Sequence, residues 1–526
     1  LQWTNLYVRN TTKRTKVREG VDQLFSTDMV RDENTGWYER QLFMTQLVGR
    51  HNLTDKLTLD WRTAYAVTER DVPYEKAIRY TVDANNIWYH DGSRVQNSTQ
   101  FSELKDTVKS FGASLTYDFS LGEGRDGQLI GGYEVLDNQR ESENRLFRFL
   151  PATGVLPYNI QYSRVDFLFS DVNISPERFV LSERTGANGA AAYDAGLFTN
   201  AAYAKVDVEV IPLVRLAAGL RYERAKQRVT IVNLFASEGA PEQVTPLKEE
   251  YVLPSATVTW NFREDMQLRA GASKTIGRPQ FRELAPQVYL DPDQDRLFAG
   301  NPYLKDTEIT NFDARYEWYY DAGQFFTAGL FYKDMENPVE ASVIDQGASL
   351  LQTYLNAPKA SLYGVEFDFK GVYDSPMEGR FFDSKQWLLM ANYTYTDSQV
   401  EAKSGDVVYP SSAAGAPRPA TDYIVDGSRL QGQSEHVANV QFGWEDQDAR
   451  SQATLLLTYV SERTSARGRP GEPDYIQKPS IRSATARSIL TTMTLARAYR
   501  SACRPSSSFL VAHLIPKTAL HFSECA

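Results

Sequence analysis

The sequence predicts an all-β protein, specifically a transmembrane antiparallel β-barrel. Three features indicate this fold: strict alternation of apolar and polar side chains, unusually long strands, and connections that alternate between short and long. The composition agrees, because 12% of the 526 residues are aromatic, with 30 Tyr and 26 Phe. Aromatic residues favour pleated surfaces that are half buried. No run of about 18 apolar residues occurs, so a transmembrane helix is not expected.

The alternation is clearest in "SLYGVEFDFK" at 361–370, where Tyr363, Val365 and Phe367 lie on one face. Glu366 and Asp368 lie on the other face, as expected of a strand with one apolar side. Similar stretches occur at 57–67, 111–119, 216–222 and 312–320. Such runs are longer than the usual strand of about five or six residues, and they approach the length that crosses a bilayer at a tilt.

The connections form two classes. Tight links are predicted at 52–55, 211–212, 263–265, 320–323 and 445–450, and long polar segments at about 71–108, 138–198, 225–250, 275–308, 334–358 and 397–434. Short turns at one end and long loops at the other are typical of outer-membrane barrels. About fifteen strands are predicted, one near 2–9 and hairpins over 37–70, 110–137, 200–224, 251–274, 309–335, 359–397 and 436–461.

Charge and composition exclude several functions. The net charge of -10 argues against a nucleic-acid partner, which needs clustered Lys and Arg. The five histidines are scattered and the cysteines, Cys503 and Cys525, lack metal-ligand spacing, so no metal or other cofactor is expected. No GxSxG motif is present, and adjacent carboxylates such as Glu249 and Glu250 are expected by chance in an acidic chain. The protein is therefore not expected to be an enzyme.

The stretch "GRPQFRELAPQVYLDPDQDRLFAGNPYLK" at 277–305 contains alternating carboxylates in "DPDQD", like positions 1, 3 and 5 of a calcium loop. Arg296 stands where such a loop needs its Gly, and Pro302 stands where it needs its bidentate Glu. A long, solvated external loop is the prediction.

Several segments together resemble the barrel of TonB-dependent outer-membrane receptors. They are "GLRYE" (219–223), "LPSATVTWNF" (253–262), "GRPQFREL" (277–284), "GNPYLK" (300–305), "GLFYKDMENPV" (329–339), "YGVEFDFK" (363–370) and "LQGQSEHVANVQFGWED" (430–446). The resemblance implies a 22-stranded barrel in a Gram-negative outer membrane, surrounded by lipid, with a plug domain in its lumen. It also implies a ligand bound at the outer face and energy supplied by a TonB complex that contacts the plug.

The sequence departs from this pattern in two places. It shows no plug and no TonB-contacting segment, so residues 1–479 are predicted to be a partial barrel, with about four strands missing before residue 2 and three after residue 461. Residues 480–526 are predicted to be an atypical tail, because no Asp or Glu occurs over 475–523, alternation stops, and the chain ends "SECA". A shifted reading frame is one hypothesis for the tail, and a divergent disordered extension is the other.

The predicted function is energy-coupled uptake of a scarce, large solute such as an iron chelate, a cobalamin-like cofactor or an oligosaccharide. A passive porin or adhesin barrel and a secreted all-β carbohydrate-active enzyme are the alternatives. Cationic and aromatic side chains of the 277–305 loop are candidates for contact with the ligand: Arg278, Arg282, Tyr289, Arg296, Phe298 and Tyr303. Carboxylates in the outer loops disfavour a bare anionic ligand, although the loop arginines could create a local positive potential.

Overall fold

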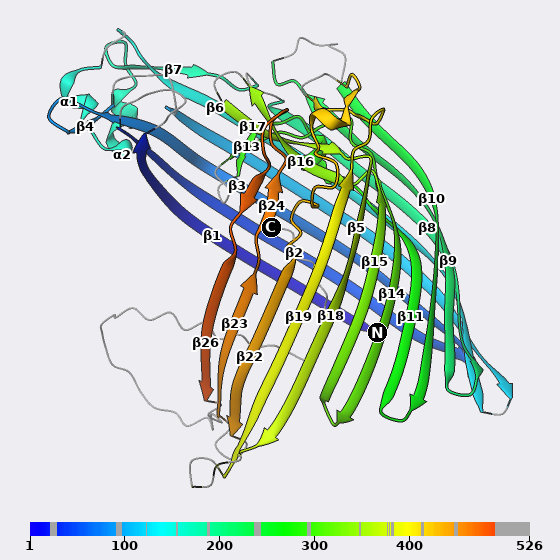
Figure 1. Cartoon of the computed structure of the whole chain (residues 1–526). Coiled ribbons are helices and arrows are strands. Elements are labelled where there is room, and N and C mark those ends of the chain that lie inside the picture. Colours follow the sequence, from blue (N-terminus) through cyan, green and yellow to red (C-terminus); the bar gives the residue numbers. More distant parts are fainter. Residues whose placement is uncertain are drawn as a thin grey trace, which may run out of the picture.

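One antiparallel sheet curls to form the wall of the molecule, as the computed structural model shows (Figure 1). The structure describes residues 1–21, 29–90, 97–122, 124–153, 156–186, 190–235, 243–291, 296–346, 349–375, 377, 379, 383–411, 415–446 and 451–489. Within these residues, each long strand pairs with the next long strand along the chain. The predicted all-β, antiparallel barrel architecture is confirmed.

Sixteen long strands make up this wall in the described part of the chain, together with the short strands β4 (Trp88–Tyr89) and β7 (Phe179–Glu183). The long strands are β1 (Gln2–Val21), β2 (Met29–Thr54), β3 (Leu57–Val82), β5 (Ser98–Gly122), β6 (Arg125–Pro151), β8 (Ala192–Ile211), β9 (Val214–Val232), β10 (Gln243–Arg263), β11 (Met266–Gly277), β14 (Thr307–Asp321), β15 (Gln324–Glu336), β18 (Lys359–Asp374), β19 (Lys385–Glu401), β22 (His436–Asp446), β23 (Ser451–Val460) and β26 (Ser480–Ile489). The fifteen predicted strands are all present.

The connections alternate between short and long, as predicted. Asp55 and Lys56 join β2 to β3, and Ala322 and Gly323 join β14 to β15. Gly323 has a φ of +74°, a conformation that glycine adopts without strain in a tight turn. The long connections gather at the opposite end of the wall, at the top of Figure 1.

The two faces of the wall differ in polarity. Phe312 on β14 and Leu330 on β15 project from the outer face and are 49% and 60% exposed. Their neighbours Asp313 and Phe331 are Cα partners and point to the opposite, inner face, because side chains alternate along a strand. The outer face therefore presents the apolar side chains that suit lipid.

The strands of the N-terminal half are longer than predicted. The segment at 71–108 was predicted to be a connection, but β3 continues to Val82 and β5 begins at Ser98. A strand that extends beyond the apolar band of the membrane does not need an apolar face. Pairing with neighbouring strands still satisfies its backbone hydrogen-bonding groups. Alternation of hydrophobicity therefore ends before the strand does.

The wall also extends into the segment predicted to be a tail. Residues Ser480–Ile489 form β26, which pairs with β23. Small and polar side chains dominate this strand, so its sequence shows no clear alternation. In the described residues the paired wall therefore continues past residue 479, whereas residues 490–526, with Cys503 and Cys525, lie outside them.

The long connections contain short elements of their own. They are α1 (Tyr158–Gln161), α2 (Val165–Leu168), η1 (Asp171–Asn173), α3 (Phe281–Leu284), β12 (Tyr289–Asp291), β13 (Arg296–Phe298), β16 (Val339–Gln346), β17 (Ser349–Asn356), β20 (Val407–Val408), β21 (Arg418–Pro419), η3 (Ala420–Asp422), β24 (Arg463–Ala466) and β25 (Tyr475–Gln477). Strands β12, β13, β17 and β16 form a separate four-stranded sheet. None of the described helices is long and apolar enough to cross a membrane.

Candidate functional site

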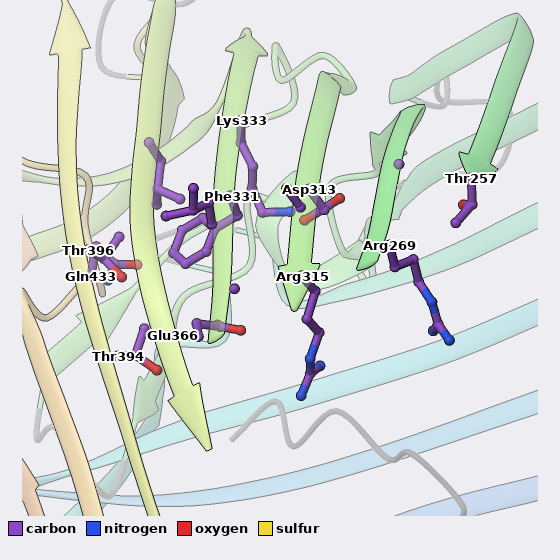
Figure 2. Close-up of a pocket in the computed structure, with 15 residues that line it drawn as sticks. Thr257, Arg269, Asp313, Arg315, Phe331, Lys333, Glu366, Thr394, Thr396 and Gln433 are labelled. Atoms are coloured by element: carbon purple, nitrogen blue, oxygen red, sulfur yellow. The ribbon is translucent and has the colours of Figure 1, made fainter. Parts of the chain in front are cut away.

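A hollow of about 670 Å³ lies against the inner face of the wall (Figure 2). The residues that line it come from β10, β11, β14, β15, β18 and β19, and Gln433 lines it from the connection before β22. Arg269 and Arg315 extend from their strands into the open space. Arg315 donates to Asp368 at 3.1 Å, and Lys333 donates to Asn311 at 2.8 Å. This part of the inner face is suited to contact a polar body.

A chain of ion pairs crosses the inner face below the outer rim, and we call it the charge ladder. Its members are Arg62, Glu134, Arg221, Glu223, Arg278 and Asp306. Cations and carboxylates alternate along it. The nitrogen–oxygen distances from Arg221 are 2.8 Å to Glu134 and 2.7 Å to Glu223, so this guanidinium bridges two strands.

The outer end of the charge ladder fixes the loop that begins after β11. Arg278 lies 2.6 Å from Glu223 and 3.6 Å from Asp306. The Tyr251 hydroxyl donates to Asp306 at 3.1 Å, and burial raises the pKa of Asp306 while Arg278 opposes that rise. Because Asp306 directly precedes β14, the ladder closes the base of the 278–306 loop.

The 278–306 loop folds over the inner face of the wall. Phe281 and Leu284 on α3 pack against Tyr193 of β8 and Val229 of β9. The Arg140 guanidinium lies 5.3 Å from the centroid of the Phe281 ring. Since these strand residues point inward, the loop leans into the mouth of the barrel.

The sequence motifs of this loop explain its shape. In "GRPQFREL", the Gln280 and Glu283 side chains form a capping box that starts α3. In "GNPYLK", a Cβ on Gly300 would lie 2.3 Å from the carbonyl oxygen of Ala285, so only glycine fits there. Asn301 is fully buried and its amide donates to the carbonyls of Tyr354 and Tyr409, both at 2.8 Å. These motif residues therefore build the loop and join it to two other outer connections.

A second buried group joins the remaining outer connections. Arg467 is fully buried and donates to Glu340 on β16 at 2.8 Å, to Ser428 at 2.9 Å and to Asp474 at 2.6 Å. Burial raises the pKa of Glu340, and the Arg467 charge opposes that rise. The connections that follow β15, β19 and β23 are thus held together by one guanidinium.

Comparison with known proteins identifies the family to which the barrel wall belongs. The family model described as TonB dependent receptor-like, beta-barrel matches residues 2–483. The chain belongs to this family. TonB-dependent receptors are proteins of the Gram-negative outer membrane, and they are receptors and transporters, not enzymes. None of the curated proteins matches the chain.

Solved structures of siderophore receptors share the fold. The siderophore receptor PiuA from Acinetobacter baumannii is 12% identical; the match covers 93% of this chain and 68% of PiuA, with a TM-score of 0.56. FpvA of P. aeruginosa, bound to heterologous pyoverdines, is 13% identical over 91% of this chain and 64% of its own, with a TM-score of 0.45. The ferric-catecholate import receptor Fiu from K12 E. coli is 14% identical over 91% and 73%, with a TM-score of 0.45. The likeness to PiuA supports the fold alone.

The structure separates the six predicted ligand residues of this receptor barrel. Arg278 belongs to the charge ladder, and Arg282 lies half buried on α3. Phe298 is 3% exposed and its ring lies 6.5 Å from that of Tyr354, so it packs inside the loop. Tyr303 is 40% exposed beside Gly415. In the β12–β13 ladder Tyr289 pairs with Phe298 and Arg296 pairs with Asp291, and the side chains of Tyr289 and Arg296 lie outside the described residues.

Sequence reasoning missed a group of basic residues on β1, β2 and β3. The sequence prediction ended the first strand near residue 9 and placed 71–108 in a connection, so the alternation of charge in these segments was not assigned to strands. Read as strands, 9–21 and 68–82 place successive charges on opposite faces. The inner face receives Arg14, Lys16, Arg18, Asp32, Arg40, Arg70, Glu75 and Arg79, and we call this surface the basic wall.

Proposed function

We propose that this receptor barrel takes up a scarce, large solute across the outer membrane in a TonB-dependent manner. The observation that carries the proposal is the inner face: it is polar and charged over the hollow, the charge ladder and the basic wall, while the outer face is apolar. Barrels with this many strands are too wide for their own side chains to fill. The solute is an iron chelate, a cobalamin-like cofactor or an oligosaccharide, and the likeness to the siderophore receptor PiuA favours an iron chelate.

A TonB complex is the proposed source of energy, acting through a plug domain inside the lumen. The inner hollow supports this part of the proposal, because Arg269 and Arg315 extend from the wall into open space. Arginine side chains in such a position can form hydrogen bonds and ion pairs with the polar surface of a plug domain. Among the predicted ligand residues, we propose Tyr303 as an aromatic contact for the solute, since it is partly exposed.

The test is uptake by cells that express the complete gene. Labelled iron chelates, cobalamin and oligosaccharides are offered to matched strains with and without a functional TonB protein. Uptake of one solute that disappears with TonB supports the proposal. Equal uptake in both strains indicates the passive porin alternative instead.

A further inference from the structure

Charged side chains in the upper parts of β1, β2 and β3, at residues 9–21, 29–40 and 68–82, are divided between the two faces of the wall. Register decides the face, because Arg14 lies opposite Gly36, and Arg18 opposite Asp32, which in turn lies opposite Arg79. The inner face carries six cations and two carboxylates, a net charge of +4. The outer face carries Arg9, Lys13, Glu19, Arg31, Glu33, Glu39, Glu69, Asp71 and Lys76, a net charge of -1.

This basic wall stands above the membrane. Arg70 is 14 positions from Lys56 in the turn between β2 and β3. At about 3.3 Å per residue and a tilt of about 40°, it lies roughly 35 Å above that turn, whereas the apolar band is about 25 Å tall. The basic wall therefore lines the outer mouth of the barrel, where a solute enters.

Arg40 and Arg70 are the centre of the basic wall. They are direct Cα partners on neighbouring strands, an arrangement in which like charges repel. Neither guanidinium forms an ion pair within the described residues: Arg70 donates to Ser102 at 3.3 Å, and Arg40 lies 5.6 Å from the centroid of the Tyr38 ring. The Arg70 Nε is buried without a hydrogen-bond partner in this part of the chain.

Neighbouring arginines on the same face are compensated. Arg79 makes a bidentate pair with Asp32 at 2.7 and 2.9 Å, and Arg140 lies 2.6 Å from Asp106. Asp106 lies one row from the central pair, opposite Thr68, but it pairs with Arg140. Glu75 lies farther along the strand and accepts a hydrogen bond from Tyr38. Burial and the charge of Arg40 lower the pKa of Arg70, as expected where cations outnumber anions.

We propose that Arg40 and Arg70 bind an anionic oxygen group, a carboxylate or a phosphate, of the solute that the barrel takes up. Two guanidinium groups held opposite each other match the two or more oxygens of such a group. The rest of the basic wall attracts the anion towards them. The inference rests on the proposed function. It differs from the expectation from sequence that carboxylates of the outer loops disfavour an anionic ligand, because in the upper parts of these three strands five of the seven carboxylates face away from the lumen.

The test measures binding of inorganic pyrophosphate to the full chain in nanodiscs of zwitterionic lipid, by isothermal titration calorimetry. The variants are R40Q/R70Q, the charge-preserving R40K/R70K, and K13Q on the outer face as the matched control. Heat-modifiable mobility on gels confirms that each variant is folded. We expect R40Q/R70Q to bind at least about tenfold more weakly, because two charged hydrogen-bond donors are lost. R40K/R70K is expected to lose less than R40Q/R70Q, and K13Q is expected to bind like the native chain.

A second arm distinguishes the source of the anion. Nanodiscs that contain lipopolysaccharide present phosphates on the outer face, and R40Q/R70Q is expected to leave lipopolysaccharide binding unchanged. Equal pyrophosphate affinity in R40Q/R70Q and the native chain overturns the proposal, and so does an equal loss in K13Q. Loss of lipopolysaccharide binding alone also overturns it. TonB-independent uptake together with intact pyrophosphate binding would instead count against the proposed function only.

Discussion

The charge ladder and the basic wall occupy the same inner face of one sheet, yet they treat charge in opposite ways. In the ladder, Arg221 sits between two carboxylates, and Glu223 sits between two arginines. In the basic wall, Arg40 faces Arg70 directly. Compensated charges hold strands and a loop together, whereas uncompensated charges are available to a ligand. The difference shows that the number of charges on a wall says less about function than their pairing.

Small residues make the charge ladder possible. Arg62, Gly112 and Glu134 are Cα partners in one row across β3, β5 and β6. A Cβ on Gly112 would lie 3.4 Å from Arg62 Nε and 3.5 Å from Glu134 Cγ. The two charged side chains therefore meet over a glycine. The row at Arg40 and Arg70 continues to Leu104, which offers no carboxylate.

Breaking the charge ladder at its centre should have the largest effect. Glu223→Gln removes the carboxylate between Arg221 and Arg278, whose side chains are 30% and 18% exposed. We expect a loss of roughly 3 kcal/mol in the free energy of unfolding, because two partly buried cations lose their shared partner. Urea unfolding of the folded barrel in detergent measures it. Glu250→Gln is the control, since Glu250 pairs with Arg224 on the exposed face of the same hairpin at 3.2 Å, and an equal loss there would contradict the account.

Replacing the glycine between Arg62 and Glu134 should have a smaller effect on the free energy of unfolding. Gly112→Leu places a side chain between Arg62 and Glu134 and separates them. The expected loss is about 1–2 kcal/mol, typical of overpacking a site that must shift. Urea unfolding reports it. Gly131→Leu is the control, because an added Cβ there meets only one backbone atom, at 4.0 Å; if both variants lose the same stability, the loss reflects glycine replacement and not the ladder.

Neutralising the basic wall should hardly change stability. R40Q/R70Q removes two like charges that face each other, so we expect the free energy of unfolding to stay the same or rise by up to about 1 kcal/mol. Urea unfolding without anion measures it. A loss comparable with that of Glu223→Gln would show that the arginine pair is structural after all.

The control on the outer face should have the smallest effect. Lys13→Gln changes one exposed charge away from the lumen. Both stability and pyrophosphate binding should remain native, with unfolding within about 0.5 kcal/mol. The same two assays check it, and a weakened affinity would mean that net charge and not position governs binding.

Sequence predicted the wall better than the site. Alternation such as that in "SLYGVEFDFK", together with the tight turns, predicted fifteen strands, all of which are present. A strand that faces lipid on one side must alternate apolar and polar side chains, so its sequence is easy to recognise. The strand ends above the membrane and β26 were missed because no apolar face marks them. Partners on the inner face depend on register across the sheet: Arg62 and Glu134 are 72 positions apart. For that reason Arg278 could not be recognised as a ladder residue, nor Arg40 and Arg70 as a pair.

The most direct test of the account is the urea midpoint of the native chain and of R40Q/R70Q, each with and without pyrophosphate. A ligand that binds only the folded state stabilises it by about 2.7 kcal/mol at one hundred times its dissociation constant. We expect pyrophosphate to raise the urea midpoint of the native chain and to leave that of R40Q/R70Q unchanged, while the two midpoints without pyrophosphate are similar. An equal rise in both proteins would contradict the claim that uncompensated arginines form the anion site.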